Sequence, residues 1–366
     1  TQQQPPNLSK SPCNNESWET NLPSPPPINW DLLYAVNSLN STASGNRSKY
    51  VIEERRVDQN DLNFAVNAKW NPVKFLTVNG GLSYKWNRTE YYKILDDLLG
   101  GDYYVNIDQF AERDFAAYPT MIQNDLDYYL RNGAAQTLAQ GDKYGYDYYA
   151  HVRRAEAWAS GRFTFGGFEA TVAGRLGYSK FWREGLLRKG LFPGLDDNGN
   201  PFTYNGEVIT KYDQIDGRPI TSKGESDKKD FLTGSGKINL GYFISGGHRI
   251  YADAAYITEA PTFNQAFISP RTRNTVMPDL KTIKTLTADI NYAYSNSGYD
   301  VRVTGFYTSI KDQTDVMSFY DDSQNSFTNF AMSGIDQRHA GIELGFSVPF
   351  FLKGLSLQGV LSLGEY

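Results

Sequence analysis

The clearest regularity in the chain is an alternation of apolar and polar residues between Thr285 and Lys311. The first arm of this segment places apolar side chains at every second position: Leu286, Ala288, Ile290, Tyr292 and Tyr294. A polar connection at 295–298 follows, and the second arm repeats the pattern with Val301, Val303, Gly305 and Tyr307. Successive side chains of a β-strand point to opposite faces of its sheet, so a period of two indicates strands. Two such arms around a glycine-containing connection predict a β-hairpin.

The same unit recurs along the chain. Apolar residues also alternate in four further pairs of segments: 62–70 with 76–86, 155–165 with 168–178, 232–244 with 250–256, and 340–348 with 355–363. These patterns predict about ten strands. Short connections of a few residues, such as Gly166-Gly167, alternate with long ones at 88–145, 183–229, 259–278 and 312–332. Transmembrane β-barrels have short turns on one side of the membrane and long loops on the other, so we expect part of such a barrel.

The long connections carry local patterns of their own. Within 88–145, we expect helical structure at Tyr91–Gly100, Asp108–Ala117 and Met121–Leu138. Residues 1–50 are rich in Pro, Ser and Asn and are predicted to be irregular, with a short ordered piece at Asn29–Asn37. The expected organisation is therefore a loop or irregular segment at 1–50 and a partial barrel at 51–366.

The two faces of the predicted strands differ in chemistry. One face carries Ala, Gly, Leu, Val and aromatic residues, and it suits contact with lipid. Aromatic rings recur near the ends of this face, as at membrane–water boundaries: Trp70, Tyr84, Trp86, Tyr178, Tyr242, Tyr256, Tyr292 and Tyr294. The other face carries Arg, Glu, Asp and Asn, which implies a wet lumen. Leu240 is predicted to face lipid near the membrane midplane, and Asn239 to face the lumen.

Composition narrows the alternatives. The 366 residues carry a net charge of −5 and have a mean hydropathy of −0.52. No run of about 18 apolar residues exists, so a transmembrane helix is not expected. A basic surface for nucleic acid is not expected either. The single cysteine, Cys13, cannot form an internal disulfide, and His151, His248 and His339 lack metal-ligand spacing. We therefore predict no cofactor and no metal site.

Several short segments, in order and at suitable spacing, carry a family resemblance. They are Glu259–Phe263, Met277–Lys281, Phe306–Gln313 and Gly341–Leu344, and together they resemble the barrel of TonB-dependent outer-membrane receptors. Val51–Arg56 and Asp96–Gly100 are similar to the Bacteroidetes branch of that family. The resemblance covers residues 28–366.

The resemblance implies active import across the outer membrane of a Gram-negative bacterium. Members of the family bind a scarce substrate at external loops and a plug, and they use energy transmitted through TonB. Both ends of the chain look cut, so we expect an internal fragment without the plug and the TonB-contacting N-terminal region. Barrels of this type have about 22 strands, and about ten strands cannot close one. The substrate class, whether siderophore, vitamin, glycan or peptide, stays open.

Candidate binding residues fall into three groups. Asp196, Asn198 and Asn200 have the spacing of a calcium loop, but Pro201 occupies the position that requires glycine, so a polar hairpin tip is the simpler interpretation. An acidic and aromatic loop could hold a cation or stack a sugar through Asp102, Tyr103 and Tyr104, beside Asp96 and Asp97. A predicted lumen set could contact substrate, or pair internally and with the plug: Arg154, Glu156, Trp158, Arg162 and Arg175.

No enzyme signature is found. Thr233–Lys237 superficially suggests a phosphate loop, but the required upstream glycine and the following Ser or Thr are absent, so we predict a strand there. Two alternatives to an active importer stay open. One is a passive porin or structural outer-membrane barrel, and the other is a secreted glycan-binding β-protein that uses the 26 tyrosines.

Overall fold

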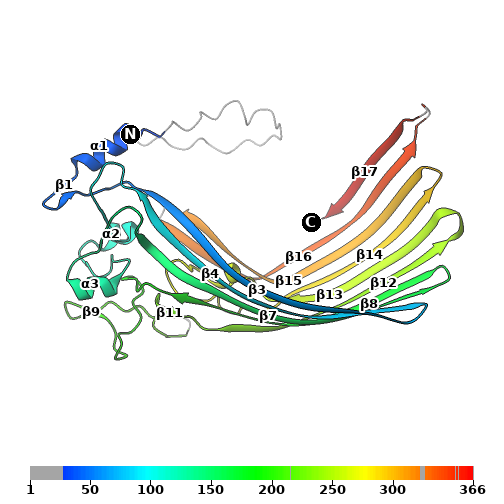
Figure 1. Cartoon of the computed structure of the whole chain (residues 1–366), viewed down its shortest axis with the longest axis horizontal. Coiled ribbons are helices and arrows are strands. Elements are labelled where there is room, and N and C mark those ends of the chain that lie inside the picture. The colour runs from blue at the N-terminus through cyan, green and yellow to red at the C-terminus, as the bar shows by residue number, and fades with distance from the viewer. Residues whose placement is uncertain (1–27, 215, 322–325, 351, 353, 366) are drawn as a thin grey trace.

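One curved antiparallel sheet forms most of the molecule (Figure 1). The computed structural model describes residues 28–214, 216–321, 326–350, 352 and 354–365. The ten principal strands are β3 (Ile52–Val73), β4 (Leu76–Asp97), β7 (Lys143–Phe165), β8 (Phe168–Gly185), β12 (Lys229–Ile244), β13 (His248–Glu259), β14 (Ile283–Asn296), β15 (Tyr299–Asp321), β16 (Ser326–Pro349) and β17 (Ser356–Glu365). Each strand pairs with its neighbour in this order, which confirms the predicted meander.

The predicted alternation of short and long connections is confirmed. Tight turns join the strand pairs at one end of the sheet, and the large loops gather at the other end (Figure 1). In the two-residue turn between β7 and β8, Gly166 has a φ of 57°, a conformation that costs least for glycine. Among the described residues, no helix is long and apolar enough to cross a membrane.

Short elements fill the large loops. The helices are α1 (Trp30–Leu39), α2 (Gln109–Phe115), α3 (Leu126–Asn132) and α4 (Phe263–Ala266), with a 3-10 turn, η1 (Ser245–Gly247), between β12 and β13. The short strands are β1 (Ser41–Thr42), β2 (Gly45–Asn46), β5 (Tyr104–Val105), β6 (Thr137–Leu138), β9 (Thr203–Tyr204), β10 (Glu207–Val208) and β11 (Gly224–Glu225). The ordered piece expected at Asn29–Asn37 is α1, and α2 lies within the helical segment expected at Asp108–Ala117. Cys13 and most of the predicted irregular segment 1–50 lie outside the described residues.

Three local predictions are wrong. Tyr91–Gly100 is not helical, because β4 continues to Asp97. This part of β4 is paired with β3, and Tyr92, for example, lies opposite Arg56. The segment 312–332 is not only a loop, because β15 and β16 extend into it. Their pairing continues from Thr314 opposite Ser333 to Asp321 opposite Ser326. Within Met121–Leu138, only α3 is helical, and β6 follows it. In the first two cases, pairing with a neighbouring strand outweighed local sequence preference.

The predicted face assignment is confirmed by the strand register. One row across the sheet joins apolar residues of eight strands: Leu76, Phe163, Ala170, Leu240, Ala252, Ile290, Gly305 and Ile342. The adjacent row holds Thr77, Arg162, Thr171, Asn239, Asp253 and Asp289. The large apolar side chains of this face are open to the surroundings, with Leu176 67% and Ile290 61% exposed. Within the described residues they do not form a two-layer core, which is the arrangement expected of a lipid-facing surface.

The height of this apolar surface matches a membrane. On β8 the continuous run of apolar outward positions begins with Phe168 and ends with Tyr178, and the positions between them are Ala170, Val172, Gly174 and Leu176. Ten residues extend about 33 Å along a strand, or about 25 Å across a membrane at a tilt of about 40°. That height equals the height of the apolar band of outer-membrane barrels, about 25 Å. On β12 the corresponding ends are Tyr242 and Leu232, which pair with Phe168 and Tyr178.

Candidate functional site

The buried residues of the molecule lie mostly among the long loops. One apolar cluster joins the top of β4 and β7 to the first large loop and contains Leu95, Tyr104, Leu138 and Tyr144. A second cluster contains Phe181 of β8 with Ala266 and Phe267 of the 260–282 loop. Phe181 pairs with Val152 in register and so lies on the polar, lumen side of the sheet. The loop that carries α4 therefore folds inward and packs on the lumen wall.

Two buried cations tie the loops together. The Arg183 guanidinium donates to the carbonyl oxygens of Pro270 and Ser222, at 2.6 and 2.8 Å, and to Asn274. The Lys189 ammonium donates to Asn124 Oδ1 at 2.7 Å and to the carbonyl oxygen of Gly145. Burial lowers the pKa of Lys189 to about 8, because its immediate partners are neutral carbonyl groups.

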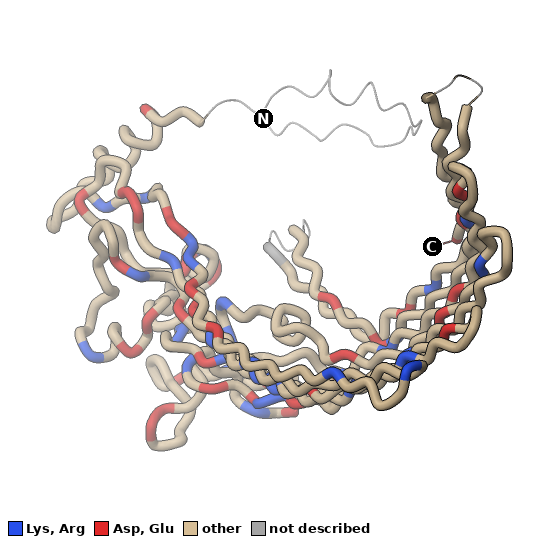
Figure 2. Tube along the Cα trace, turned by 45° about the vertical axis from the view of Figure 1, so that its right-hand side comes forward, with Lys and Arg blue, Asp and Glu red and all other residues tan. Residues whose placement is uncertain are grey.

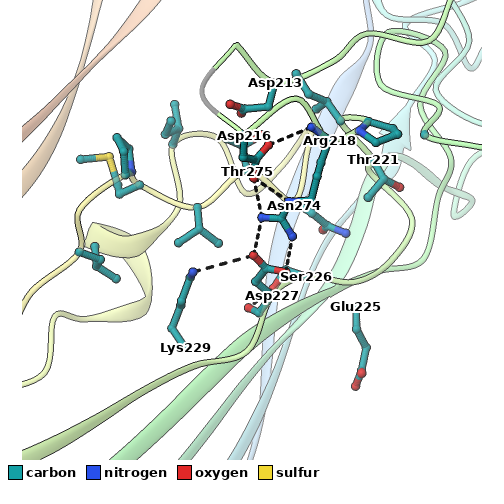
Figure 3. Close-up of a pocket in the computed structure, with 18 of the residues that line it drawn as sticks. Asp213, Asp216, Arg218, Thr221, Glu225, Ser226, Asp227, Lys229, Asn274 and Thr275 are labelled. Carbon is teal, nitrogen blue, oxygen red and sulfur yellow. Dashed lines mark hydrogen bonds and ion pairs between the residues drawn. The ribbon is translucent and has the colours of Figure 1, made fainter.

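A cavity of about 600 Å³ opens between the loops at 186–228 and 260–282 (Figure 3). Its walls are contributed by both loops and by the first residue of β12, Lys229. Five carboxylate residues line the cavity: Asp213, Asp216, Glu225, Asp227 and Asp279. Two cationic residues, Arg218 and Lys229, oppose them. The cavity is therefore acidic, and apolar residues such as Ile268, Val276 and Leu280 close one side of it.

Arg218 organises the charges of this cavity. Its Nη1 and Nη2 donate to the two oxygens of Asp227 at 3.0 and 2.8 Å, and its Nε donates to Asp216 at 2.6 Å (Figure 3). The Arg218 main-chain N–H and then its guanidinium lower the pKa of Asp216. The guanidinium likewise lowers the pKa of Asp227. Both carboxylates therefore stay ionised into mildly acidic conditions.

Lys211 and Arg273 supply further positive charge near the cavity. Both lie over the Phe192 ring: Lys211 Nζ is 5.6 Å and Arg273 Cζ is 5.1 Å from the ring centre. Burial, and secondarily the charge of Arg273, lowers the pKa of Lys211. The arrangement offers a ligand a mixed surface of carboxylates, cations and aromatic rings.

The structure brings three of the predicted lumen residues together. Glu156 Oε1 lies 2.8 Å from Arg154 Nη2 and 3.2 Å from Arg175 Nη1. Arg175 also reaches Glu259 at the end of β13, at 3.8 Å. This network lies on the polar face and spans β7, β8 and β13. The expected internal pairing of these charges is therefore present, and contact with substrate stays a prediction.

The other two lumen candidates make no ion pair with this network: Arg162 lies nearer the short turns, and Trp158 lies beside Arg175. Arg162 donates to Glu169 at 2.8 Å, near the short turns, and Arg249 approaches the same carboxylate at 3.5 Å. Trp158 sits opposite Arg175 in the register and is 36% exposed. Trp158 is thus available on the lumen wall, whereas Arg162 closes a charge pair close to the turn end of the barrel.

The three loop candidates contribute to the packing of the first loop. Asp102 accepts a hydrogen bond from the main-chain N–H of Asn46 at 2.7 Å, and the Tyr103 hydroxyl lies 2.8 Å from Thr42 Oγ1. Tyr104 is buried, and its hydroxyl accepts a hydrogen bond from Gln109. These three residues lie in the first large loop, whereas the residues of the lumen network lie on strands β7, β8 and β13.

The calcium-like segment forms a closed turn. Asp196 Oδ1 accepts hydrogen bonds from the main-chain N–H groups of Asn198 and Asn200, at 2.9 and 2.7 Å. The carboxylate is thus used to close the polar tip, in agreement with the simpler interpretation. Within the described ranges, no group of three or more His, Cys, Asp or Glu is arranged to hold a metal ion. Thr233–Lys237 lies in β12, as predicted.

Sequence reasoning missed the acidic cavity and the two buried cations. Arg218 and Asp227 are nine residues apart, and Arg183 meets Asn274 across 91 residues, so no local spacing marks either contact. The available signal was weak: an excess of Asp in the turn-rich segment 196–227. Only the folding of one loop against another brings these residues together.

The fold and the outward apolar band define a membrane-spanning β-barrel wall with loops folded over its lumen. Residues 14–364 match the family described as "TonB dependent receptor-like, beta-barrel". The chain therefore belongs to the TonB-dependent receptor β-barrel family, a family of transporters rather than enzymes that is located in the bacterial outer membrane. This membership confirms the resemblance seen in the sequence.

Solved structures of outer-membrane transport proteins are similar to this chain at low sequence identity, and the first of them shares its fold. The copper transporter OprC is 13% identical, with a TM-score of 0.53, over 85% of this chain and 38% of OprC. The ferric yersiniabactin uptake receptor FyuA from Yersinia pestis is 14% identical, with a TM-score of 0.46, over 88% of this chain and 38% of that chain. This chain thus spans less than two fifths of the length of either protein. Comparison with curated proteins gives no significant match.

Proposed function

We propose that this chain forms part of the wall and external loops of an active importer that takes up a scarce nutrient. The observation that carries the proposal is the inward fold of the 260–282 loop, which packs on Phe181 and closes the acidic cavity with the 186–228 loop. An importer must hold its substrate before admitting it, and the cavity between these two loops offers a surface that can do so. Family membership supports the same reading.

The cavity lining favours one kind of ligand within that function. Five carboxylates against two cations favour a substrate that presents positive charge or many hydrogen-bond donors, such as a cationic peptide or a polyol. An anionic substrate would leave these carboxylates opposed to like charge. Arg154, Glu156, Trp158 and Arg175 would then form a second set of contacts further down the lumen wall, with Arg162 lower still.

The partners of the whole protein are part of the proposal. The apolar band contacts outer-membrane lipid, and energy reaches the transporter through TonB at an N-terminal region of the parent protein. The alternatives make different predictions. A porin would pass its solute without TonB, and a secreted glycan-binding protein would stay soluble and monomeric without detergent.

Uptake by cells that express the full-length parent protein tests the proposal. Candidate nutrients are first screened by growth of a knockout strain, and uptake of the responding nutrient is then measured with and without TonB. We expect uptake to require TonB, and uptake that continues at the same rate without TonB would contradict active import.

A matched pair of variants tests the cavity. Asp227→Asn removes a carboxylate from the cavity, and we expect weaker substrate binding. Asp197→Asn makes the same change in charge on the same loop, where the side chain is 99% exposed and outside the cavity, and should leave binding unchanged. Equal affinities of the two variants would show that the cavity is not the binding site.

A further inference from the structure

Two cationic side chains beside the acidic cavity have no carboxylate partner. Lys211 lies on the 186–228 loop, and Arg273 lies on the 260–282 loop. In the part of the chain that the structure describes, neither side chain forms an ion pair or a hydrogen bond, and the Arg273 Nε atom is buried. Arg218 within the cavity differs, because Asp216 and Asp227 both accept hydrogen bonds from it. Lys211 and Arg273 therefore carry charge that can bind a ligand.

Aromatic rings hold these two cations without neutralising them. Lys211 Nζ lies 5.2 Å from the centre of the Phe115 ring, at the end of α2, and 5.6 Å from the centre of the Phe192 ring. The Arg273 guanidinium lies over the same Phe192 ring, with Cζ 5.1 Å from its centre. The face of a ring attracts a cation but has no net charge. Two positive charges thus share one ring where three loop segments meet.

The surroundings disfavour the charged form of both side chains. Burial, and secondarily the charge of Arg273, lowers the pKa of Lys211. Burial also lowers the pKa of Arg273, and the attraction of Asp213 offsets only part of this effect. A bound anion would oppose both causes, because an opposite charge nearby favours the charged form of a cation. An anionic group is therefore the ligand that this pair favours.

The main chain beside both cations is fixed, and it adjoins the cavity. Asn274, which follows Arg273, donates its main-chain N–H to the carbonyl oxygen of Thr221 at 2.8 Å. The carbonyl oxygen of Lys211 accepts a hydrogen bond from the main-chain N–H of Ile220 at 2.8 Å. Asn274, Thr221 and Ile220 all line the acidic cavity. The two cations are thus held next to the carboxylates before a ligand arrives, which lowers the entropy cost of binding.

We propose that Lys211 and Arg273 bind a carboxylate group of the substrate, and that the substrates are zwitterionic peptides. This inference rests on the proposed function, and it selects between the two kinds of ligand that the cavity favours. A peptide places a cationic group among the cavity carboxylates and its own carboxylate on Lys211 and Arg273. A polyol leaves these two cations without an anion. Arginine donates to both oxygens of a carboxylate at once, and lysine adds a point charge.

Binding of peptides that differ only at the carboxyl terminus tests the proposal. The full-length parent protein in detergent is titrated by calorimetry with lysine-containing peptides of two to five residues, each as the free carboxylate and as the carboxamide. We expect the peptide that binds best to lose about tenfold to a hundredfold in affinity as the carboxamide, because hydrogen bonds to a charged group are stronger than those to a neutral one. Equal affinity of the two forms would overturn the proposal.

A matched pair of arginine variants assigns the carboxylate to this site. Arg273→Gln should remove most of the preference for the free carboxylate and leave the affinity for the carboxamide unchanged. Arg271→Gln makes the same change two residues away, where the side chain is exposed and lies over the Tyr146 ring, and should leave the preference intact. If Arg273→Gln does not fold, Lys211→Gln takes its place.

Two results would contradict the assignment. One is the same preference in the two variants, and the other is the absence of binding by every peptide. Neither result would refute active import, which is measured separately by TonB-dependent uptake of the nutrient that the growth screen identifies.

Discussion

Arginine substitutions along β12 test the lipid-facing assignment most directly. Ile238 faces outward, four residues from Tyr242 and six from Leu232, which mark the two ends of the apolar band on this strand. Ile238→Arg therefore puts a charge near the membrane midplane, where the cost is about 2–4 kcal/mol. Leu240 lies only two residues from Tyr242, so the expectation that it sits at the midplane needs correction. We expect Leu240→Arg to cost about 1–2 kcal/mol, since the penalty falls toward the interfaces.

Asn239 provides the control, because it lies between these two residues in the sequence but on the opposite face of the strand. Its amide donates to Asp253 at 2.7 Å on the polar face, and an arginine there can pair with the same carboxylate. We expect Asn239→Arg to change the free energy of unfolding by less than about 1 kcal/mol.

The assay is reversible unfolding of the full-length parent protein in lipid vesicles by denaturant, followed by tryptophan fluorescence. Midpoints and slopes of the three variants and the wild type give the differences in free energy. A cost that is the same at residues 238, 239 and 240 would refute the assignment of the two faces. A cost that is larger at Leu240 than at Ile238 would refute the position of the band.

Three further predictions concern the loops. Burial lowers the pKa of Lys189 to about 8 from its ordinary value of 10.5. Between these two pH values the unfolded state therefore binds more protons than the folded state. The stability of the loops should rise by about 1–3 kcal/mol as the pH increases across this window. In Lys189→Met this rise should vanish, as measured by thermal unfolding of the loops at pH 8 and 10.5. Asp227→Asn removes the two-point contact with Arg218 and should lower stability by about 0.5–1 kcal/mol in a denaturant titration, because the pair is exposed. Gly185→Ala should displace the 186–223 loop, since a Cβ atom there would overlap a main-chain carbonyl oxygen, whereas Gly236→Ala has open space and should be neutral by hydrogen exchange of the loop amides.

The period of two determined most of the architecture from the sequence alone. Alternation at 285–311 and in the other paired segments predicted the strands, their order and the face that contacts lipid. Successive side chains of a strand lie on opposite faces, so the apolar residues of each strand identify its lipid-facing side. The alternation of turn and loop lengths then fixed which end of each strand carries the loops. Ordered short segments were sufficient to indicate the family.

Tertiary structure decided everything that depends on contacts between distant residues. The extension of β4 to Asp97 followed from pairing with β3, although Tyr91–Gly100 looked helical in isolation. The meeting of Arg218 with Asp227, and of Arg183 with Asn274, followed from the packing of one loop on another. Local preference reaches only a few residues along the chain, whereas a cavity is built from loops whose ends are set by the sheet. The sequence therefore determined the strands of the barrel wall, and the packing of the loops decided the shape and the lining residues of the cavity.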